Sequence, residues 1–250
     1  MPDEFSGKVA LVTGASRGIG ASTAIALARR GVARVVVHYN GYREGAERTA
    51  AAIRDAGAVC DILAADLGAE SGIASFIERL PEADILVNNA GSLVKRARLL
   101  EFSGELYDRV MNLNVKSVWT ITQAIVPSMV RKGGGVIVNL SSIAARNGGG
   151  PGATVYAAAK AAVMTFTKGF AKELAPLGIR VNAVSPGTVD NDFHQKFSTR
   201  QILDSVVAMT PAGRLSTNED VSGVIVFLCS EAARYIHGQT IEINGGLLAP

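Results

Sequence analysis

The chain has 250 residues, 48% of them hydrophobic and 19% charged, and its formal net charge is +3. This length can bury a large core as one α/β domain or two small ones, and the composition excludes a disordered chain. The weak and scattered positive charge suits a phosphate-bearing ligand but is too small to indicate nucleic acid as a partner.

The N-terminus and the metal-binding residue types exclude further classes. The first five residues, MPDEF, carry acids where a secretory signal carries bases, and no apolar run approaches the roughly 18 residues of a membrane helix. We therefore expect a soluble cytoplasmic protein with no membrane partner. Cys60 and Cys229 lie in apolar surroundings and are expected to be buried, reduced thiols. No metal site is expected, because metal-ligand spacing is missing among the histidines, His38, His194 and His237.

Short β-rich runs alternate with longer helical patterns along the chain. Strands are predicted at 9–13, 35–38, 59–64, 85–88, 136–140, 179–184 and 240–243, and helices at 19–30, 44–56, 71–80, about 105–131, 154–175 and about 217–230. Because the strands are continuously apolar, the pattern indicates a parallel sheet with helices on both faces. We predict one doubly wound domain of about seven strands over residues 1–250, in which ligands bind at the carboxyl ends of the strands.

The first strand is followed by a glycine-rich turn that opens a helix, Thr13-Gly14-Ala15-Ser16-Arg17-Gly18-Ile19-Gly20. This context lets backbone N–H groups and a helix N-terminus approach a pyrophosphate. The turn is not a P-loop, because no Gly-Lys-Ser/Thr follows, and its spacing is G-x-x-x-G-x-G instead of G-x-G-x-x-G. Taken alone, a purely structural turn is the alternative interpretation.

The second strand ends in Val37-His38-Tyr39-Asn40-Gly41-Tyr42-Arg43, with no acid before Glu44. An acid at this position would hold the ribose 2′-hydroxyl of NAD, whereas neutral or basic residues leave room for a 2′-phosphate. Arg17 and Arg43 are placed where either could reach that phosphate, unless both are ordinary surface charges. NADP is therefore favoured over NAD.

Polar residues also follow the third and fourth strands. Asp66-Leu67 could accept a hydrogen bond from an adenine amino group or cap the next helix. Asn88-Asn89-Ala90-Gly91 offers small residues for a close backbone approach. Asn114, inside a predicted helix, is a poor choice unless its side chain bonds a water or a distorted backbone turn.

Tyr156 and Lys160 stand four apart on one face of an alanine-rich predicted helix. A cation close to a phenol favours the phenolate, so we expect Lys160 to lower the pKa of Tyr156 and to make its proton available for a carbonyl oxygen or an alcohol. The fifth strand ends in Asn139-Leu140-Ser141-Ser142, and the loop 148–152 returns the chain to Tyr156. Ser142 and Tyr156 are therefore expected to converge on one carbonyl oxygen.

The sixth strand ends in another tight turn, Ser185-Pro186-Gly187-Thr188. The polar stretch from Asp190 to about Arg200 is longer than a usual connection, and we predict an irregular segment that forms a substrate lid around 188–212. Six residues in this lid and after the fourth strand are compatible with an anionic substrate and equally with a charged surface loop: Lys95, Arg96, Arg98, Phe193, His194 and Lys196.

In combination, these motifs resemble the short-chain dehydrogenase/reductase family. The T-G-x-x-x-G-I-G turn, N-N-A-G, the serine, Y-x-x-x-K and P-G occur in the family's order, and the similarity runs from Lys8 to Gly246. It implies a Rossmann-type fold and an NADP(H)-dependent oxidoreductase that transfers a hydride between the nicotinamide and a ketone or secondary alcohol, without a metal.

The resemblance also implies roles for single residues. Ser142, and not its neighbour Ser141, helps to hold the substrate carbonyl, and Tyr156 is the general acid or base. Lys160 binds the nicotinamide ribose and lowers the tyrosine's pKa, while Asn114 orders a water that relays protons. Cofactor contacts are expected from Gly14, Ser16, Arg17, Gly18, Ile19, Gly20, Tyr39, Asn40, Arg43, Asp66, Leu67, Asn88, Ala90, Gly91, Tyr156, Lys160, Pro186, Gly187 and Val189.

Two positions depart from the family pattern. Asn191 stands where relatives carry a threonine that contacts the nicotinamide amide, so either Asn191 or Thr188 could make that contact. Asn244 replaces an aspartate before the paired glycines, outside the expected chemistry.

The substrate and the direction of the reaction stay open at this stage. A 3-oxoacyl thioester is the first candidate, and a keto sugar, polyol or other small hydroxylated carbonyl compound is the second. A nucleotide-sensing protein without catalysis is the rival class, but it would tolerate losses among the Ser, Tyr and Lys residues, and none is lost. Relatives usually form tetramers, so a homotetramer is expected through the alanine-rich helix and the last strand; packing of Ala157, Ala161 and Ala162 inside one subunit is the alternative.

Overall fold

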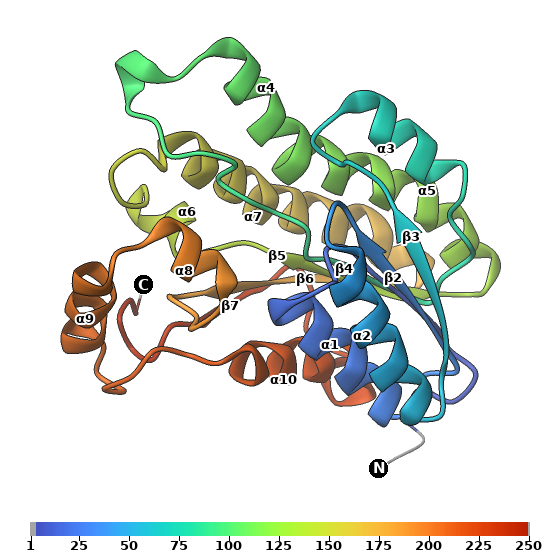
Figure 1. Ribbon diagram of the computed structural model, residues 1–250. Helices are drawn as coiled ribbons and strands as arrows, with labels where there is room; N and C mark the ends of the chain where they lie inside the picture. The colour runs from blue at the N-terminus through green and yellow to red at the C-terminus, as the bar shows by residue number, and fades with distance from the viewer. Residues whose placement is uncertain (1–3, 250) are drawn as a thin grey trace.

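The computed structural model describes residues 4–249, which form one seven-stranded sheet with helices on both faces (Figure 1). Every neighbouring pair of strands is parallel, and the order is β3-β2-β1-β4-β5-β6-β7. The strands are β1 (Val9–Val12), β2 (Arg34–Tyr39), β3 (Val59–Ala64), β4 (Ile85–Asn88), β5 (Gly135–Leu140), β6 (Ile179–Pro186) and β7 (Thr240–Ile243). The predicted seven-stranded, doubly wound sheet is confirmed.

Helices connect the successive strands along the chain. The longer ones are α1 (Gly18–Arg29), α2 (Arg43–Asp55), α3 (Glu70–Ile77), α4 (Gly104–Met111), α5 (Ser117–Arg131), α7 (Thr154–Leu174), α9 (Arg200–Met209) and α10 (Asn218–Cys229). Two short helices, α6 (Ala144–Asn147) and α8 (Asp192–Phe197), lie in connections, and single turns occur at η1 (Leu99–Glu101), η3 (Ala175–Leu177) and η4 (Glu231–Ala233).

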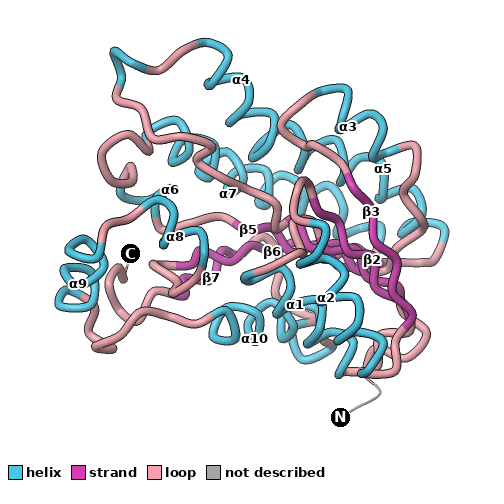
Figure 2. The backbone as a smooth tube through the Cα atoms, in the orientation of Figure 1, coloured by secondary structure: helices cyan, strands magenta, loops and turns pink. Residues whose placement is uncertain are grey.

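Two apolar clusters lie on the two faces of the sheet. One contains buried residues of α1, α2 and α10, and the other those of α3, α5 and α7. Neighbouring strand residues alternate between them: Ala10 and Val12 face the first cluster, and Leu11 faces the second. The strands therefore read as continuous apolar runs because each face of the sheet is covered. Figure 2 shows the strands side by side between the two helix layers.

The strand order reverses beside β1, which pairs with β2 on one side and β4 on the other. A crevice at such a point, outside the carboxyl ends of the strands, is where open parallel sheets bind ligands. The loops after β1, β4, β5 and β6 all leave the sheet at this edge, so the fold brings together residues that are far apart in sequence.

Two predicted elements differ from the structure. The long helix predicted at 105–131 is interrupted by a π-helical turn, η2 (Asn112–Lys116), between α4 and α5. The stretch after Asp190 is not irregular, because it folds into α8 and α9, whose first turns are capped by the side chains of Asn191 and Thr199.

The described residues also bear on the cysteines, on membrane-spanning helices and on metal ligands. Cys60 and Cys229 are buried free thiols, as predicted. Between residues 4 and 249, no helix is both long and apolar enough to cross a membrane. Over the same range, no three His, Cys, Asp or Glu side chains gather in a way that could hold a metal ion.

Candidate active site

Ser142, Tyr156 and Lys160 meet at the carboxyl edge of β5. Ser142 lies two residues after β5, and Tyr156 and Lys160 lie on the first two turns of α7. The Ser142 hydroxyl lies close enough to the phenol of Tyr156 to lower its pKa, and the Ser142 oxygen accepts from the backbone N–H of Ala144 at 3.1 Å. The expected convergence of the two hydroxyls is therefore present in the structure.

Lys160 does not lower the pKa of Tyr156, contrary to the prediction. Burial raises the pKa of Tyr156 to about 12, and the neighbouring Ser142 hydroxyl only partly opposes this shift. The Lys160 ammonium lies 5.7 Å from the centre of the tyrosine ring. Burial also lowers the pKa of Lys160 to about 8, so the loss of solvation dominates for both groups. At neutral pH the phenol is protonated and can donate its proton.

Lys160 is a buried residue of the site. Its side chain is only 3% exposed, and its ammonium donates to the carbonyl oxygen of Leu140 at 2.8 Å. No carboxylate within residues 4–249 forms an ion pair with it. A Cβ at Gly91 would lie 2.8 Å from both Lys160 Nζ and Asn114 Oδ1, so the absence of a side chain at Gly91 lets these two polar groups approach the β4 loop.

Asn114 lies at the centre of the π-helical turn and is fully buried. Its Nδ2 donates to the carbonyl oxygens of Val110 at 2.8 Å and Ser92 at 2.9 Å, and its Oδ1 accepts from the N–H of Ser92 at 3.2 Å. The side chain thus satisfies backbone groups of a distorted helix and ties that helix to the loop after β4. This is one of the two roles predicted for it from the sequence.

Ser141 and Ser142 have different environments. Ser141 is buried and its hydroxyl donates to the carbonyl oxygen of Lys160 at 2.9 Å, so it braces α7 against β5. Ser142 is the serine that faces Tyr156. The geometry therefore agrees with the choice of Ser142 over Ser141.

The glycine-rich turn after β1 is fixed by its neighbours. The Thr13 hydroxyl accepts from the N–H groups of Asn89 and Ala90, both at 3.0 Å, and Asn89 Nδ2 donates to the carbonyl oxygens of Thr13 and Gly14. Gly14 has φ +64°, and a Cβ there would lie 2.9 Å from Ala90 Cα. The first glycine therefore serves the close packing of the β1 and β4 loops.

The start of α1 fits the pyrophosphate of a dinucleotide. Gly18 has φ +60°, and a Cβ on it would meet no atom of the described residues closer than 3.7 Å. The N-cap residue of α1, Arg17, makes no side-chain capping bond among the described residues, so this helix N-terminus lacks a side-chain cap. An uncapped helix N-terminus beside an open glycine is suited to an anionic phosphate.

His38 supports the same turn and was not recognised from the sequence. Its Nδ1 accepts from the N–H of Gly14 at 3.0 Å, its Nε2 lies 3.1 Å from the carbonyl oxygen of Ala65, and its own carbonyl oxygen accepts from Ala15. Burial lowers the pKa of His38 to about 4, so the ring is neutral and Nδ1 is free to accept. The available signal was a single imidazole in an otherwise apolar strand.

The adenosine end of the site is rich in arginine. Arg17 pairs with Asp192 at 3.2 Å, and Arg43 pairs with Glu47 at 2.7 Å. Asp66 accepts from Arg109 at 2.8 Å and from the N–H of Gly68 at 2.9 Å. Asn40 Nδ2 donates to Asp66 Oδ1 at 3.4 Å, so the Asp66 carboxylate lies beside the end of β2, although β2 itself contains no acid.

The remaining predicted cofactor residues also follow strand ends. The side chains of Asn88 and Leu67 point into the core: Asn88 Nδ2 donates to Thr122 and Asn139, and Leu67 is 1% exposed. Only the backbone of these two residues is therefore available to a ligand. The others are placed along the same edge: Ser16, Ile19 and Gly20 at the start of α1, Tyr39 at the end of β2, Ala90 after β4, and Pro186, Gly187 and Val189 at and after the end of β6.

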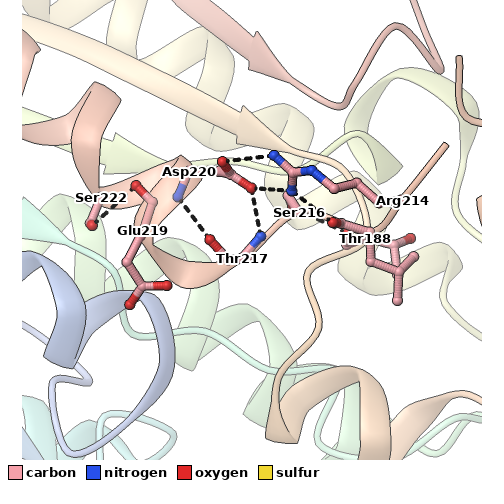
Figure 3. A network of polar contacts seen from close by, with 8 residues as sticks. Thr188, Arg214, Ser216, Thr217, Glu219, Asp220 and Ser222 are labelled. Atoms are coloured by element: carbon pink, nitrogen blue, oxygen red, sulfur yellow. Dashed lines mark hydrogen bonds and ion pairs between the residues drawn. The ribbon is translucent and has the colours of Figure 1, made fainter. Parts of the chain in front are cut away.

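The loop after β6 is braced by a polar network (Figure 3). The N–H and the hydroxyl of Ser216 donate to the carbonyl oxygen of Thr188, each at 3.2 Å. Arg214 meets both carboxylate oxygens of Asp220, which also accepts from the N–H of Thr217. A cavity of about 240 Å³ adjoins this network and is lined by Thr188, Arg214 and Ser216 among others.

The Asn191 side chain is bonded to α8 and to the start of α10. Its Oδ1 caps α8 by accepting from Phe193, and its Nδ2 donates to Asn218 Oδ1, both at 3.1 Å. The amide is therefore occupied by protein partners, whereas no hydrogen bond of the Thr188 hydroxyl occurs among the described residues.

The helix α8 lies directly over Tyr156. The rings of Phe193 and Tyr156 have their centres 6.0 Å apart, and Phe193 also packs against His194 and Phe197. Arg96 donates to the carbonyl oxygens of Phe197 at 2.8 Å and Pro151 at 2.9 Å. Arg96 therefore joins α8 to the loop before α7, and its guanidinium is used by backbone carbonyls instead of facing a substrate.

Comparisons with known proteins agree on one family. The sequence model of a family described as "Enoyl-(Acyl carrier protein) reductase" matches residues 14–248. A 3-oxoacyl-(acyl-carrier-protein) reductase of Staphylococcus epidermidis is 38% identical over 96% of this chain and 98% of its own length. One from Thermotoga maritima is 36% identical over 98% of this chain and 99% of its own.

Solved structures give a similar result. A protein of Beutenbergia cavernae described as an NAD(P)-dependent gluconate 5-dehydrogenase, with NADP bound at low occupancy, is 35% identical with a TM-score of 0.90 over the whole of both chains. A gluconate 5-dehydrogenase of Burkholderia cenocepacia in complex with NADP and tartrate is 33% identical with a TM-score of 0.86, over 98% of this chain and 97% of that one.

Proposed function

The chain belongs to the short-chain dehydrogenase/reductase family and is an NADP(H)-dependent oxidoreductase acting on a ketone or secondary alcohol, and from this premise we propose that its substrate is a 3-oxoacyl thioester. Two curated relatives that match 96% and 98% of this chain are 3-oxoacyl-(acyl-carrier-protein) reductases, which supports this substrate class. The carboxyl edge of the sheet, with an uncapped helix and an open glycine, suits the dinucleotide.

We propose that Tyr156 is the general acid and Ser142 the second donor to the carbonyl oxygen. The single observation that carries this assignment is that the Ser142 hydroxyl lies beside the phenol of Tyr156, with the buried Lys160 ammonium 5.7 Å from the tyrosine ring centre. NADP(H), when bound, supplies or accepts the hydride. Ser142 and Tyr156 hold the carbonyl oxygen where negative charge develops, and Tyr156 donates its proton there.

Lys160 and Asn114 support this pair. The proposed role of Lys160 is to bind the nicotinamide ribose and to keep a positive charge beside the phenol ring. Asn114 holds the π-helical turn next to the Lys160 ammonium, and its role in the proton relay rests on this closeness. We assign the contact with the nicotinamide amide to Thr188, because the Asn191 amide is already bonded on both sides.

A second substrate class has its own support. Two of the solved structures that match the whole fold are described as gluconate 5-dehydrogenases, and one holds tartrate, a small hydroxylated acid. A keto sugar or polyol acid would fit a site in which an aromatic ring lies close to Tyr156, and Phe193 of α8 supplies this ring. A long thioester requires this ring to move, so α8 and α9 are proposed as the substrate lid over 188–212 of a single domain.

The assembly and location are also proposals. Ala157 is buried within one subunit, whereas Trp119 on α5 is half-exposed and packs against Phe166 of α7. Such a partly exposed aromatic face supports a homotetramer through the α5–α7 layer and β7. We propose that the enzyme works in the cytoplasm without a nucleic-acid or membrane partner; light scattering of the purified protein tests the assembly.

A panel of carbonyl substrates tests the function. We expect reduction of a 3-oxoacyl thioester with NADPH and much weaker activity with NADH. Tyr156→Phe should abolish turnover and leave cofactor binding largely intact. Preference for 5-ketogluconate would favour the second substrate class, preference for NADH would contradict the cofactor assignment, and a fully active Tyr156→Phe would contradict the role of the phenol. Cofactor binding without any turnover across the panel would favour the nucleotide sensor.

A further inference from the structure

Tyr42 is surrounded by arginine at the adenosine end of the site. The guanidinium carbon of Arg17 lies 5.2 Å from the centre of the Tyr42 ring, and that of Arg48 lies 5.3 Å from it. Arg48 also donates a hydrogen bond to the Tyr42 hydroxyl. One aromatic ring therefore contacts two cations that come from different segments of the chain.

The backbone fixes the position of this ring. Tyr42 directly precedes α2, and its carbonyl oxygen accepts from the N–H of Ala46. Gly45, on the first turn of α2, has no room for a side chain because the Tyr42 ring and the carbonyl oxygen of Ser16 fill that space. The ring is thus wedged between α2 and the glycine-rich turn, next to Arg17.

The acids that pair with these arginines are exposed. Asp192 pairs with Arg17, with 58% and 56% of the two side chains exposed, and Glu44 pairs with Arg48 at 2.5 Å. Exposed ion pairs of this kind contribute little and exchange easily. A phosphate dianion can replace these carboxylates, whereas the contact of each guanidinium with the ring needs no acid and persists after the exchange.

We propose that Tyr42 is a positioning residue for the adenosine 2′-phosphate, holding Arg17 and Arg48 against its ring at the end of β2 so that both face this phosphate. The inference rests on the proposed function, since it concerns the same NADP site. Tyr42 favours NADP over NAD only indirectly, because the arginines, and not Tyr42, bind the phosphate. A planar guanidinium stacked on a ring keeps its N–H groups free at the edge for bidentate bonds to the phosphate.

Equilibrium binding of two fragments tests the proposal without turnover. Adenosine 2′,5′-bisphosphate and adenosine 5′-monophosphate are titrated into the wild type, Tyr42→Leu, Tyr42→Phe and the control Tyr235→Leu, which changes a tyrosine that is 97% exposed. We expect the wild type to bind the bisphosphate more tightly. Tyr42→Leu should lose about 5- to 10-fold in bisphosphate affinity, as expected for two lost cation–π contacts, while its affinity for the monophosphate stays within about 2-fold.

The other variants separate the ring from the hydroxyl. Tyr42→Phe keeps the ring and should retain most of the preference, and Tyr235→Leu should behave as the wild type. In kinetics, Tyr42→Leu should raise KM for NADPH and leave kcat and the KM for NADH unchanged. Adding Tyr42→Leu to Arg17→Met should cost less than it costs in the wild type, because part of its effect acts through Arg17.

Four results would overturn the proposal: an unchanged bisphosphate preference in Tyr42→Leu, an equal loss for both fragments, a loss in Tyr42→Phe as large as in Tyr42→Leu, or full additivity with Arg17→Met. A wild type that does not distinguish the two fragments would instead contradict the NADP assignment itself. The two failures are therefore distinguishable in the same titrations.

Discussion

Replacing Lys160 by methionine should make the protein more stable at neutral pH while abolishing its activity. Lys160 is 3% exposed, and its ammonium has one backbone acceptor, Leu140, and no carboxylate partner in the described chain. Burial lowers its pKa from 10.5 to about 8. At about 1.4 kcal/mol for each pKa unit, the charged form costs the folded state about 3 kcal/mol.

Methionine removes this cost but also removes the hydrogen bond to Leu140, which offsets about 1 kcal/mol or somewhat more. We therefore expect Lys160→Met to raise the free energy of unfolding by about 1–2 kcal/mol at pH 7. Below pH 8 the lysine is protonated in both the folded and the unfolded chain, so the full penalty is present there.

The pH dependence gives the prediction its sign. Between pH 8 and 10.5 the unfolded chain still binds the proton that the folded protein has released, so the stability of the wild type rises relative to that of the variant. The advantage of Lys160→Met should shrink by about 2–3 kcal/mol from pH 7 to pH 10 and can reverse in sign. All other titrating groups are common to both proteins and cancel in the difference.

Urea unfolding followed by circular dichroism, at one fixed protein concentration and without cofactor, measures these differences. Lys168→Met is the matched control, because Lys168 lies on the same helix and is exposed; it should change stability little at any pH. A Lys160→Met variant that is less stable than the wild type at pH 7, with a difference that does not depend on pH, would refute the reasoning.

Three further predictions concern the surroundings of the site. Gly91→Ala places a Cβ 2.8 Å from Lys160 Nζ and Asn114 Oδ1 and should lower kcat at least about 10-fold, which steady-state assays measure; an unchanged kcat would contradict the close packing. His38→Leu leaves the Gly14 N–H unpaired and should weaken NADPH binding about 10-fold in fluorescence titrations, with partial rescue in His38→Gln; equal binding by all three proteins would exclude a positioning role. Arg96→Met releases α8 and should raise KM for the carbonyl substrate several-fold with little change in KM for NADPH, and the opposite pattern would contradict the proposed lid.

The sheet and most of its helices could be predicted from the sequence because their signals are local. The runs Ile85–Asn88 and Thr240–Ile243 have the predicted bounds: the first is fully buried, as expected for a strand covered on both faces, and the second is a half-buried edge strand rich in β-branched residues. Asn114 could also be singled out from local sequence, because a regular helix does not favour an amide side chain in its interior. The π-helical turn around it explains why the residue is tolerated there.

The helices α8 and α9 and the support of the glycine-rich turn could not be predicted, because they depend on capping and on contacts between distant segments. The region after Asp190 looked irregular, yet Asn191 and Thr199 start two helices, and Arg96 anchors the first of them from 101 residues away in sequence. His38 pairs with Gly14 across two strands, a contact that only the register of β1 and β2 makes visible.

The tyrosine–lysine pair shows where motif reasoning stops. A spacing of four residues on one helix face places the Lys160 ammonium near the Tyr156 phenol. The pKa of each group, however, depends on how much hydration the group loses on burial, and the spacing carries no information on burial. Here burial raises the pKa of Tyr156 and lowers that of Lys160, so both shifts favour the neutral forms. A neutral phenol is a proton donor, which is the form required to reduce a carbonyl group. Oxidation of an alcohol requires the phenolate, so the protonation state of the isolated protein favours reduction. We therefore expect the oxidation rate to rise with pH without a matching rise of the reduction rate.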